Sequence, residues 1–360
     1  MKEYSGNSVG MTIGLDLGDK YGQYYTLDEA GVNIETGRVM LLPSALEKRF
    51  GKLERSRMVL ESGTHSGWVS RLLESFGHEV VVANARKLRL ISQNENKDDA
   101  VDAELLARLG RVDPRLLYPI RHRGPEVQSD LALLRARDAL VKVRGQLINH
   151  MRGTVKCGGG RLPQCSTASF HRKAEVGIPA ELKAALEPLL EMTEELSGQI
   201  RAYEREVERL CRERYRETEL LQQVGGVGTL TSLCYVLTLE DPHRFAKSRA
   251  VGSFLGLRPG KDKSGEQDPE LRITKAGNPQ LRRLLVQSAQ QMLGPFGADC
   301  DLRRWGLKLA GRGRKNAKKR AVAAVARKLA VLLHRLWVNG EVYDPLYQAQ
   351  RHPVSQEVSA

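Results

Sequence analysis

The chain has 360 residues, with 57 Lys and Arg against 43 Asp and Glu, which gives a net charge of +14. This length allows two or three domains, each with its own core, and the charge predicts a polyanionic partner, nucleic acid ahead of a membrane surface. No run of 18 apolar residues could span a bilayer, and the first residues hold no apolar signal core. We therefore expect no membrane partner and a cytoplasmic, nucleoid-associated location.

The cysteines predict reduced thiols. The five are widely spaced and form no Cys-x-x-Cys pair, which argues against structural disulfides and a structural zinc site. They are Cys157, Cys165, Cys211, Cys234 and Cys300.

The first third alternates strand and helix patterns, which predicts an α/β domain over residues 1–120. Apolar runs bounded by turn residues predict the strands, and amphipathic spacing predicts the helices. The expected elements are a strand at 11–17, a hairpin with arms at 24–27 and 32–34, a helix at 44–54, a strand at 57–61, a helix at 66–76, a strand at 78–83 and a helix opening near 99.

Four acidic residues stand out against this apolar background. Asp16 lies in the first strand, Glu61 ends the strand at 57–61, and Asp99 and Asp102 open the last helix. Residues three apart share one face of a helix, so Asp99 and Asp102 can point the same way. An Asp98/Asp102 pair, four residues apart, is also geometrically possible.

Carboxylates brought together on apolar strands need compensation, which a divalent cation usually supplies. Two such ions could clamp the attacking and leaving oxygens of a phosphodiester. An all-carboxylate site favours Mg²⁺ or Mn²⁺ over zinc. We expect about two ions per site.

The middle of the chain, residues 121–217, predicts a long helical arm. Apolar residues recur every seven positions from Val127 to Val155, and at alternating spacings of four and three from Leu182 to Leu210. This spacing is typical of a coiled-coil seam. The loop between the two stretches leaves two forms open, an antiparallel helical hairpin or a dimerisation arm.

The last third, residues 218–346, predicts a mainly helical domain with nucleic-acid contacts, and a polar tail follows at 347–360. A glycine turn leads into an apolar helix at 229–239, as in a helix-hairpin-helix element, where backbone N–H groups meet phosphate. After this helix come segments in which nearly all the charged residues are Lys or Arg, which favours contact with phosphate. The expected nucleic-acid-binding residues are Gly225, Gly226, Gly228, Arg272, Lys275, Arg282, Arg283, Arg312, Arg314, Lys315, Lys318 and Lys319.

Several motifs in this order resemble one family, the DEDD transposases of bacterial insertion sequences. That group includes the Piv-type invertases and the RNA-guided bridge recombinases. The first domain resembles the family's RuvC-like, RNase H-like domain, and the last resembles its transposase domain. The motifs are Ile13-Gly14-Leu15-Asp16, Leu60-Glu61-Ser62, Asp98–Ala103, Val224–Gly228, Phe254–Pro259, Ser264-Gly265, Ile273–Asn278 and Leu281–Leu285.

The resemblance implies a role for each candidate residue. Asp16, Glu61, Asp99 and Asp102 would bind the metal ions, and Ser264 would be the nucleophile that becomes joined to DNA. A serine nucleophile needs its oxygen deprotonated, the target phosphate neutralised and the leaving 3′ oxygen stabilised. A 3′-hydroxyl of the partner strand would reverse the link.

The same resemblance implies the partners. These are donor and target double-stranded DNA, a non-coding bridge RNA that selects the target by base pairing, and further copies of the chain in a dimer or tetramer. One protomer would complete the other's site, because the acids and Ser264 lie far apart in the sequence.

Three alternatives remain. A RuvC-like junction nuclease would use water and would not need Ser264. A sugar-kinase or actin-like ATPase is suggested by Gly14–Gly18, but no second phosphate motif follows. A non-catalytic nucleic-acid scaffold would require that the acids fail to converge.

Overall fold

The computed structural model describes residues 10–87, 99–260, 271–313 and 316–347, with the side chain of Asp99 excepted. The chain divides into two compact units, one ending at Gly124 and the other beginning at Pro125. Each unit is described by itself. The segments that hold Ser264, Arg314 and Lys315, and the predicted tail from residue 348 onward, lie outside the described residues.

The first unit is built on a five-stranded sheet with the order β3-β2-β1-β4-β5. The first three strands form an antiparallel meander, and β4 and β5 continue the sheet in parallel with β1. This topology confirms the predicted α/β class and is consistent with an RNase H-like domain. The strands are β1 (Thr12–Leu17), β2 (Tyr21–Leu27), β3 (Asn33–Met40), β4 (Arg57–Glu61) and β5 (Glu79–Ala83).

The second arm of the hairpin is longer than the sequence predicts. β3 continues past Ile34 to Met40, although this stretch is polar and contains Gly37. Its pairing with β2 explains the extension, and the Tyr24 ring lies against Gly37, where a Cβ would be 2.4 Å from the Tyr24 hydroxyl. Tertiary pairing here overrides a weak local strand preference.

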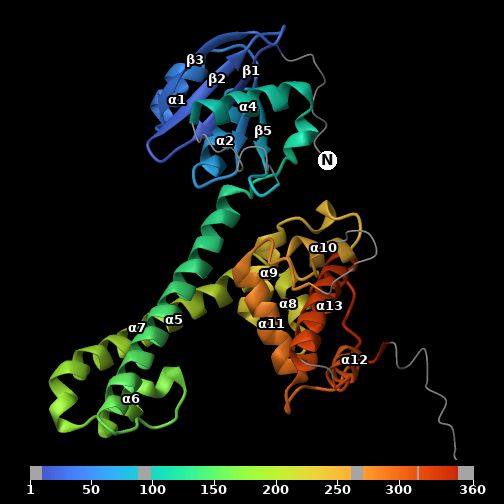
Figure 1. The fold of residues 1–360 in the computed structure, drawn as a ribbon. Coiled ribbons are helices and arrows are strands. Elements are labelled where there is room, and N and C mark those ends of the chain that lie inside the picture. The colour runs from blue at the N-terminus through green and yellow to red at the C-terminus, as the bar shows by residue number, and fades with distance from the viewer. Residues whose placement is uncertain (1–9, 88–98, 261–270, 314–315, 348–360) are drawn as a thin grey trace, which may run out of the picture. The chain divides into compact units, whose positions relative to one another are not determined.

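Helices cover both faces of the sheet (Figure 1). Helices α1 (Pro43–Phe50) and α2 (Ser66–Ser75) pack on one face, around Leu15 and Leu60. Helix α4 (Asp99–Val112) and the 3-10 turn η1 (Pro114–Leu117) pack on the other face, against the side chains of β4 and β5.

The second unit begins with two long helices, α5 (Pro125–Cys157) and α7 (Lys183–Glu213), which pack side by side (Figure 1). Arg137 pairs with Glu204, and Arg144 bonds Ser197, so the helices run antiparallel within one chain. Their far end has a small core of its own. It is closed by η2 (Thr167–Ser169), α6 (Phe170–Ala174), η3 (Glu175–Gly177) and η4 (Ala180–Leu182).

The remaining helices surround α9, whose residues from Thr231 to Leu239 are all buried. The near ends of α5 and α7 add Leu134 and Leu210 to the same core. The helices are α8 (Glu217–Gln222), α9 (Thr229–Leu239), η5 (Pro242–Arg244), α10 (Arg249–Phe254), α11 (Pro279–Leu293), α12 (Asp301–Ala310) and α13 (Ala317–Asn339).

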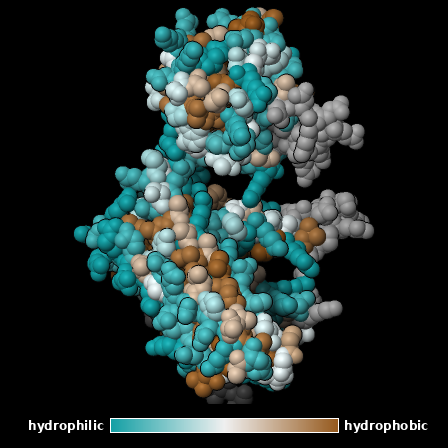
Figure 2. Space-filling model, turned by 90° about the vertical axis from the view of Figure 1, so that its left-hand side faces the viewer, coloured by the Kyte–Doolittle hydropathy of each residue, from teal (hydrophilic) through white to brown (hydrophobic). Residues whose placement is uncertain are grey.

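The surface is mainly polar. On the face drawn in Figure 2, hydrophilic residues predominate and hydrophobic ones gather in limited patches. Within the described ranges, no helix has the length and apolar character that crossing a bilayer requires.

Candidate active site and nucleic-acid contacts

Asp16 and Glu61 lie at the carboxyl ends of neighbouring parallel strands. The parallel pairing of β1 with β4 ends with Leu15 opposite Leu60, and the two acids follow immediately in the sequence. Side chains alternate along a strand, so both acids share the face of Gly14 rather than that of Leu15. That face is the one α4 covers.

Helix α4 lies unusually close to β1 at Gly14. A Cβ on Gly14 would lie 2.0 Å from the carbonyl oxygen of Ala103 and 2.6 Å from the amide nitrogen of Ala107. No side chain fits there, so the glycine sets the approach of the helix. Asp102 immediately precedes the residue that Gly14 contacts.

The direction of α4 brings its start to the two strand ends. The guanidinium of Arg57, at the beginning of β4, donates to the carbonyl of Gly110 near the end of the helix at 3.0 Å. The other end of α4, with Asp102, therefore lies over the carboxyl ends of the strands. Burial raises the pKa of Glu61, and the neighbouring Asp102 carboxylate raises it further. The two carboxylates thus lie close enough for their charges to interact.

Asp99 is the first residue of α4, one turn before Asp102. Among the side chains that the structure describes, no three of His, Cys, Asp or Glu are grouped closely enough to hold a metal ion. The donors nevertheless suit a hard cation, because they are all carboxylates and because the partly buried Glu61 and Asp102 carboxylates repel one another. A cation between Glu61 and Asp102 would offset that repulsion.

The segment that holds Ser264 is tied at its base by a short antiparallel pairing. The amide of Gly260 donates to the carbonyl of Arg272, and that of Thr274 donates to the carbonyl of Arg258, both at 2.9 Å. Pro259 and Ile273 form the bridge between them. The two flanks of residues 261–270 are thus held side by side.

Arg282 fastens this base to α11. Its guanidinium donates to the carbonyls of Leu255 at 3.1 Å and Ala276 at 2.6 Å. Gly256 and Gly277 have φ values of +67° and +72°, and a Cβ on Gly256 would lie 2.2 Å from the amide nitrogen of Ala276. The sequence predicts that Arg282 binds nucleic acid, and that stays a prediction. In the structure its guanidinium holds two backbone carbonyls, a contact that a basic segment does not reveal.

The other predicted basic contacts differ in their surroundings. Arg283 is exposed and pairs with Asp138 on α5. Arg272 and Lys275 are exposed beside the Ser264 segment, and Lys275 has a φ of +55°. These last two side chains are open to solvent.

The start of α13 gathers positive charge at a helix N-terminus. Arg312, Lys318 and Lys319 are exposed, and the first turn of α13 contains no acidic residue. Cations are unfavourable at this end of a helix dipole unless an anion lies nearby. The arrangement suits phosphate contact.

The glycine turn at 224–228 lies between α8 and α9. Gly226 has a φ of +86° and packs on the carbonyl of Ser288, while Gly225 and Gly228 are exposed. Gly228 precedes α9 and has no side chain to cap it. Helix α8, the glycine turn and α9 follow one another in the chain, and the helix-hairpin-helix element stays a prediction.

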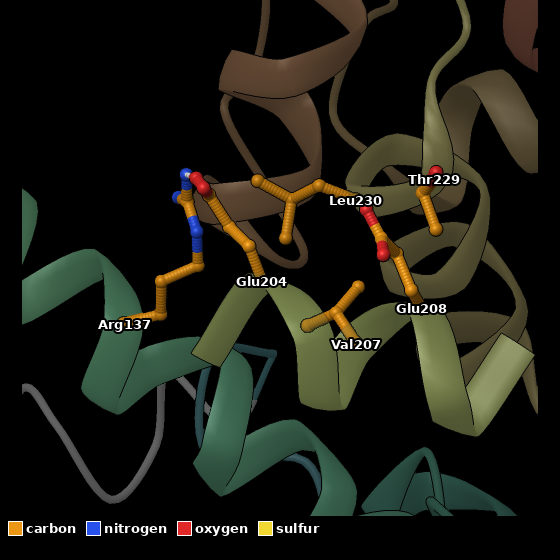
Figure 3. Close-up of a pocket in the computed structure, with 6 residues that line it drawn as sticks. All are labelled: Arg137, Glu204, Val207, Glu208, Thr229 and Leu230. Carbon is orange, nitrogen blue, oxygen red and sulfur yellow. Dashed lines mark hydrogen bonds and ion pairs between the residues drawn. The ribbon is translucent and has the colours of Figure 1, made fainter. Parts of the chain in front are cut away.

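A small pocket flanks this helix start on its α7 side (Figure 3). Thr229 and Leu230 line it from α9, Glu208 from α7, and the paired Arg137 and Glu204 close its other end. Glu208 places negative charge beside the start of α9. Gly225, which is exposed on the glycine turn, is not among the residues that line this pocket.

Two family models match the chain. The model of the IS110-type DEDD transposases, described as "Transposase", matches residues 13–157, and the model described as "Transposase IS116/IS110/IS902 family" matches residues 218–297. The first match includes all four acids, and the second includes the glycine turn and Ser264.

Curated relatives agree with the models. A protein of Sinorhizobium fredii named "Putative transposase y4pF/y4sB" is 30% identical over 92% of this chain and 85% of its own length. The transposase for insertion sequence element IS1111A of Coxiella burnetii is 27% identical over 92% of this chain and 90% of its own length. The transposase for insertion sequence element IS1328 of Yersinia enterocolitica is 27% identical over 77% of this chain and 82% of its own length. This chain belongs to the IS110 family of DEDD transposases. It is an enzyme that cuts and rejoins DNA, and its family indicates dependence on a divalent metal.

Proposed function

We propose that this transposase joins Ser264 covalently to DNA, with divalent ions held by Asp16, Glu61, Asp99 and Asp102. The observation that carries the proposal is the meeting of two strand ends with the start of α4, where Glu61 and Asp102 repel one another. An acidic group on apolar strands is costly without a cation, so its presence supports a metal-assisted reaction.

The ions would be Mg²⁺ or Mn²⁺, about two per site, and when bound they would neutralise the phosphate and stabilise the leaving oxygen. The chain's own residues then have the following roles. Ser264 Oγ loses its proton and attacks the phosphorus, and the DNA 3′ oxygen leaves as a hydroxyl. A 3′-hydroxyl of the partner strand attacks the same phosphorus and returns the proton to Ser264. Arg272, which is exposed close to residues 261–270 in the sequence, would hold a phosphate oxygen.

The proposed partners follow from the same chemistry. Donor and target duplexes would bind the basic segments, including Arg312, Lys318 and Lys319. A non-coding bridge RNA would select the target by base pairing, which suits a protein with only 5% aromatic residues. A dimer, or a tetramer when both duplexes are present, would bring the acids of one protomer to Ser264 of another.

The test is a denaturing gel of the full chain with labelled donor DNA, the RNA transcribed from the flanks of its element, and Mg²⁺. We expect a covalent protein–DNA band from the wild type and from Glu104→Gln, and none from Ser264→Ala or Asp102→Ala. Glu104 is the matched control, since it lies on α4 and pairs with Arg108.

Cleavage that persists in Ser264→Ala without a covalent band would overturn the serine mechanism and leave a nuclease that uses water. A covalent band that survives Asp102→Ala would instead remove the metal-binding role of the acids.

A further inference from the structure

The most exposed hydrophobic side chain that the structure describes is Phe296, which is 98% accessible to solvent. It lies in the loop between α11 and α12, beside Pro295 and Ala298, which are also exposed. The exposed tyrosines are far less open, between 37% and 51%. At this exposure, Phe296 has almost no cover from the residues that the structure describes.

The loop presents Phe296 from a fixed turn. The amide of Gly297 donates to the carbonyl of Gly294 at 3.2 Å, which closes a four-residue turn with Phe296 at its third position. Arg303 of α12 donates to the carbonyls of Met292 and Gly294. A Cβ on Gly297 would lie 2.1 Å from the Met292 oxygen, so the turn is tightly packed beneath the exposed ring.

The same loop borders the glycine turn that precedes α9. A Cβ on Gly225 would lie 4.0 Å from the Cβ of Ala298, two residues after Phe296. Gly225 and Ala298 are both exposed at this point. Helix α12, of ten residues, then spans about 15 Å to the basic segment that begins at Arg312.

We propose that Phe296 stacks on a DNA base that is unpaired or unstacked at the point of strand exchange. This inference rests on the proposed function, because rejoining strands between two duplexes requires that base pairs open. Every base has an apolar face that an aromatic ring can cover, whatever the sequence. The open amides of the glycine turn would hold the neighbouring phosphate.

A second copy of the chain is the less favoured occupant. Stable protein interfaces bury about 800 Å² on each partner around an apolar centre. Phe296 is instead a single ring among small and polar residues, such as Gln290 and Gln291, which are exposed on the last turn of α11.

The test uses the full chain and donor DNA that carries 2-aminopurine at successive positions around the cleavage site. Phe296→Ala is compared with Phe296→Trp and Phe296→Leu, and Val176→Ala is the control, because Val176 is 93% exposed at the far end of the arm. Melting temperatures of all variants establish that they fold.

We expect Phe296→Ala to weaken binding to DNA with an unpaired base about fivefold to a hundredfold. The fluorescence change at one 2-aminopurine position should disappear with it. Phe296→Trp should keep both properties, Phe296→Leu should lose both, and Val176→Ala should match the wild type.

Equal binding by Phe296→Ala and the wild type would overturn the inference. So would restoration by leucine, which would indicate an apolar contact without stacking, or a loss of oligomer size with unchanged DNA affinity. The covalent band is measured in the same reactions. A wild type that binds through Phe296 but forms no band would disprove the serine mechanism and leave the stacking role intact.

Discussion

The two halves of the proposed site are built in different ways. In the first unit, backbone pairing of β1 and β4 aligns Asp16 with Glu61, and one glycine sets how closely α4 approaches them. In the second, the flanks of the Ser264 segment depend on a short pairing and on one arginine side chain. The first half is therefore fixed by the packing of regular elements. The second is held by two backbone hydrogen bonds and by the side chain of Arg282, whose bonds a single substitution can remove.

The largest effect should come from filling the contact between β1 and α4. Gly14→Ala places a methyl group against backbone atoms that cannot move aside, and we expect a loss of about 1–3 kcal/mol in the free energy of unfolding. Covalent-band formation should fall with it, because Asp102 would be displaced.

Urea unfolding followed by Trp68 fluorescence measures this loss, in a background where Trp305 and Trp337 are replaced by Phe. Trp68 then reports on the first unit alone. Gly63→Ala is the control, since a Cβ there meets no atom within 4 Å. An unchanged midpoint for Gly14→Ala would show that α4 does not lie as close to β1 as described.

The next largest effect should come from Arg282, which bonds the backbone beside the segment that holds Ser264. Arg282→Ala should lower the rate of covalent-band formation about tenfold to a hundredfold, because a loosened base misplaces the attacking group. Single-turnover cleavage measures the rate. The neighbouring Arg283→Ala removes only a surface ion pair with Asp138 and should stay within about twofold of the wild type. Equal losses in the two variants would point to phosphate binding instead of positioning.

Replacing Glu61 should have a smaller effect, and it should stabilise the protein rather than destabilise it. The pKa of Glu61 is raised above its ordinary value of 4.5, so its ionisation costs folding stability as the pH rises through the folded-state pKa. Without divalent metal at pH 7, Glu61→Gln should therefore raise the melting temperature, by up to about 4 °C.

The gain should vanish below pH 4.5, where the carboxyl is protonated in both states. Added Mg²⁺ should stabilise the wild type more than the variant. Calorimetry across pH, with and without Mg²⁺, checks both points, and a variant less stable than the metal-free wild type at pH 7 would contradict them.

The smallest expected change in stability comes from replacing Asp138 on α5. Burial raises the pKa of Asp138, but the hydrogen bonds from Lys142 and Arg283 have the larger combined effect, so the pKa of Asp138 lies below its ordinary value. The stabilisation is thus present above the ordinary pKa of 3.8 and is lost as the pH falls through the folded-state value. Asp138→Asn should cost less than about 1 kcal/mol at pH 7. Urea unfolding should show this difference shrinking toward pH 3, and a constant difference would rule out the ionised pairs as its source.

The same contrast decides how much the sequence could predict. Alternating apolar residues placed β1 and β4 within a residue of their ends, so Asp16 and Glu61 could be assigned to strand ends. The seven-residue spacing likewise placed α5 and α7. In these elements the residue pattern reflects burial directly.

Contacts between distant residues could not be predicted in this way. A basic stretch gives Arg282 and Arg283 the same appearance, yet one bonds backbone carbonyls and the other an exposed acid. Phe296 was missed because hydrophobic residues are expected in the core. The signal that could have found it is the sequence Gly294-Pro295-Phe296-Gly297, a turn pattern with an aromatic residue at its exposed position.

The antiparallel arm has one more consequence, which concerns length. Arg137 lies opposite Glu204, and seven residues further along each helix Arg144 lies opposite Ser197. These two contacts lie about 10 Å apart along the arm, between one core at its base and another at its far end. Removing or adding seven residues on both helices would change its reach in such steps and leave both cores intact. The arm is in this sense a spacer with discrete lengths.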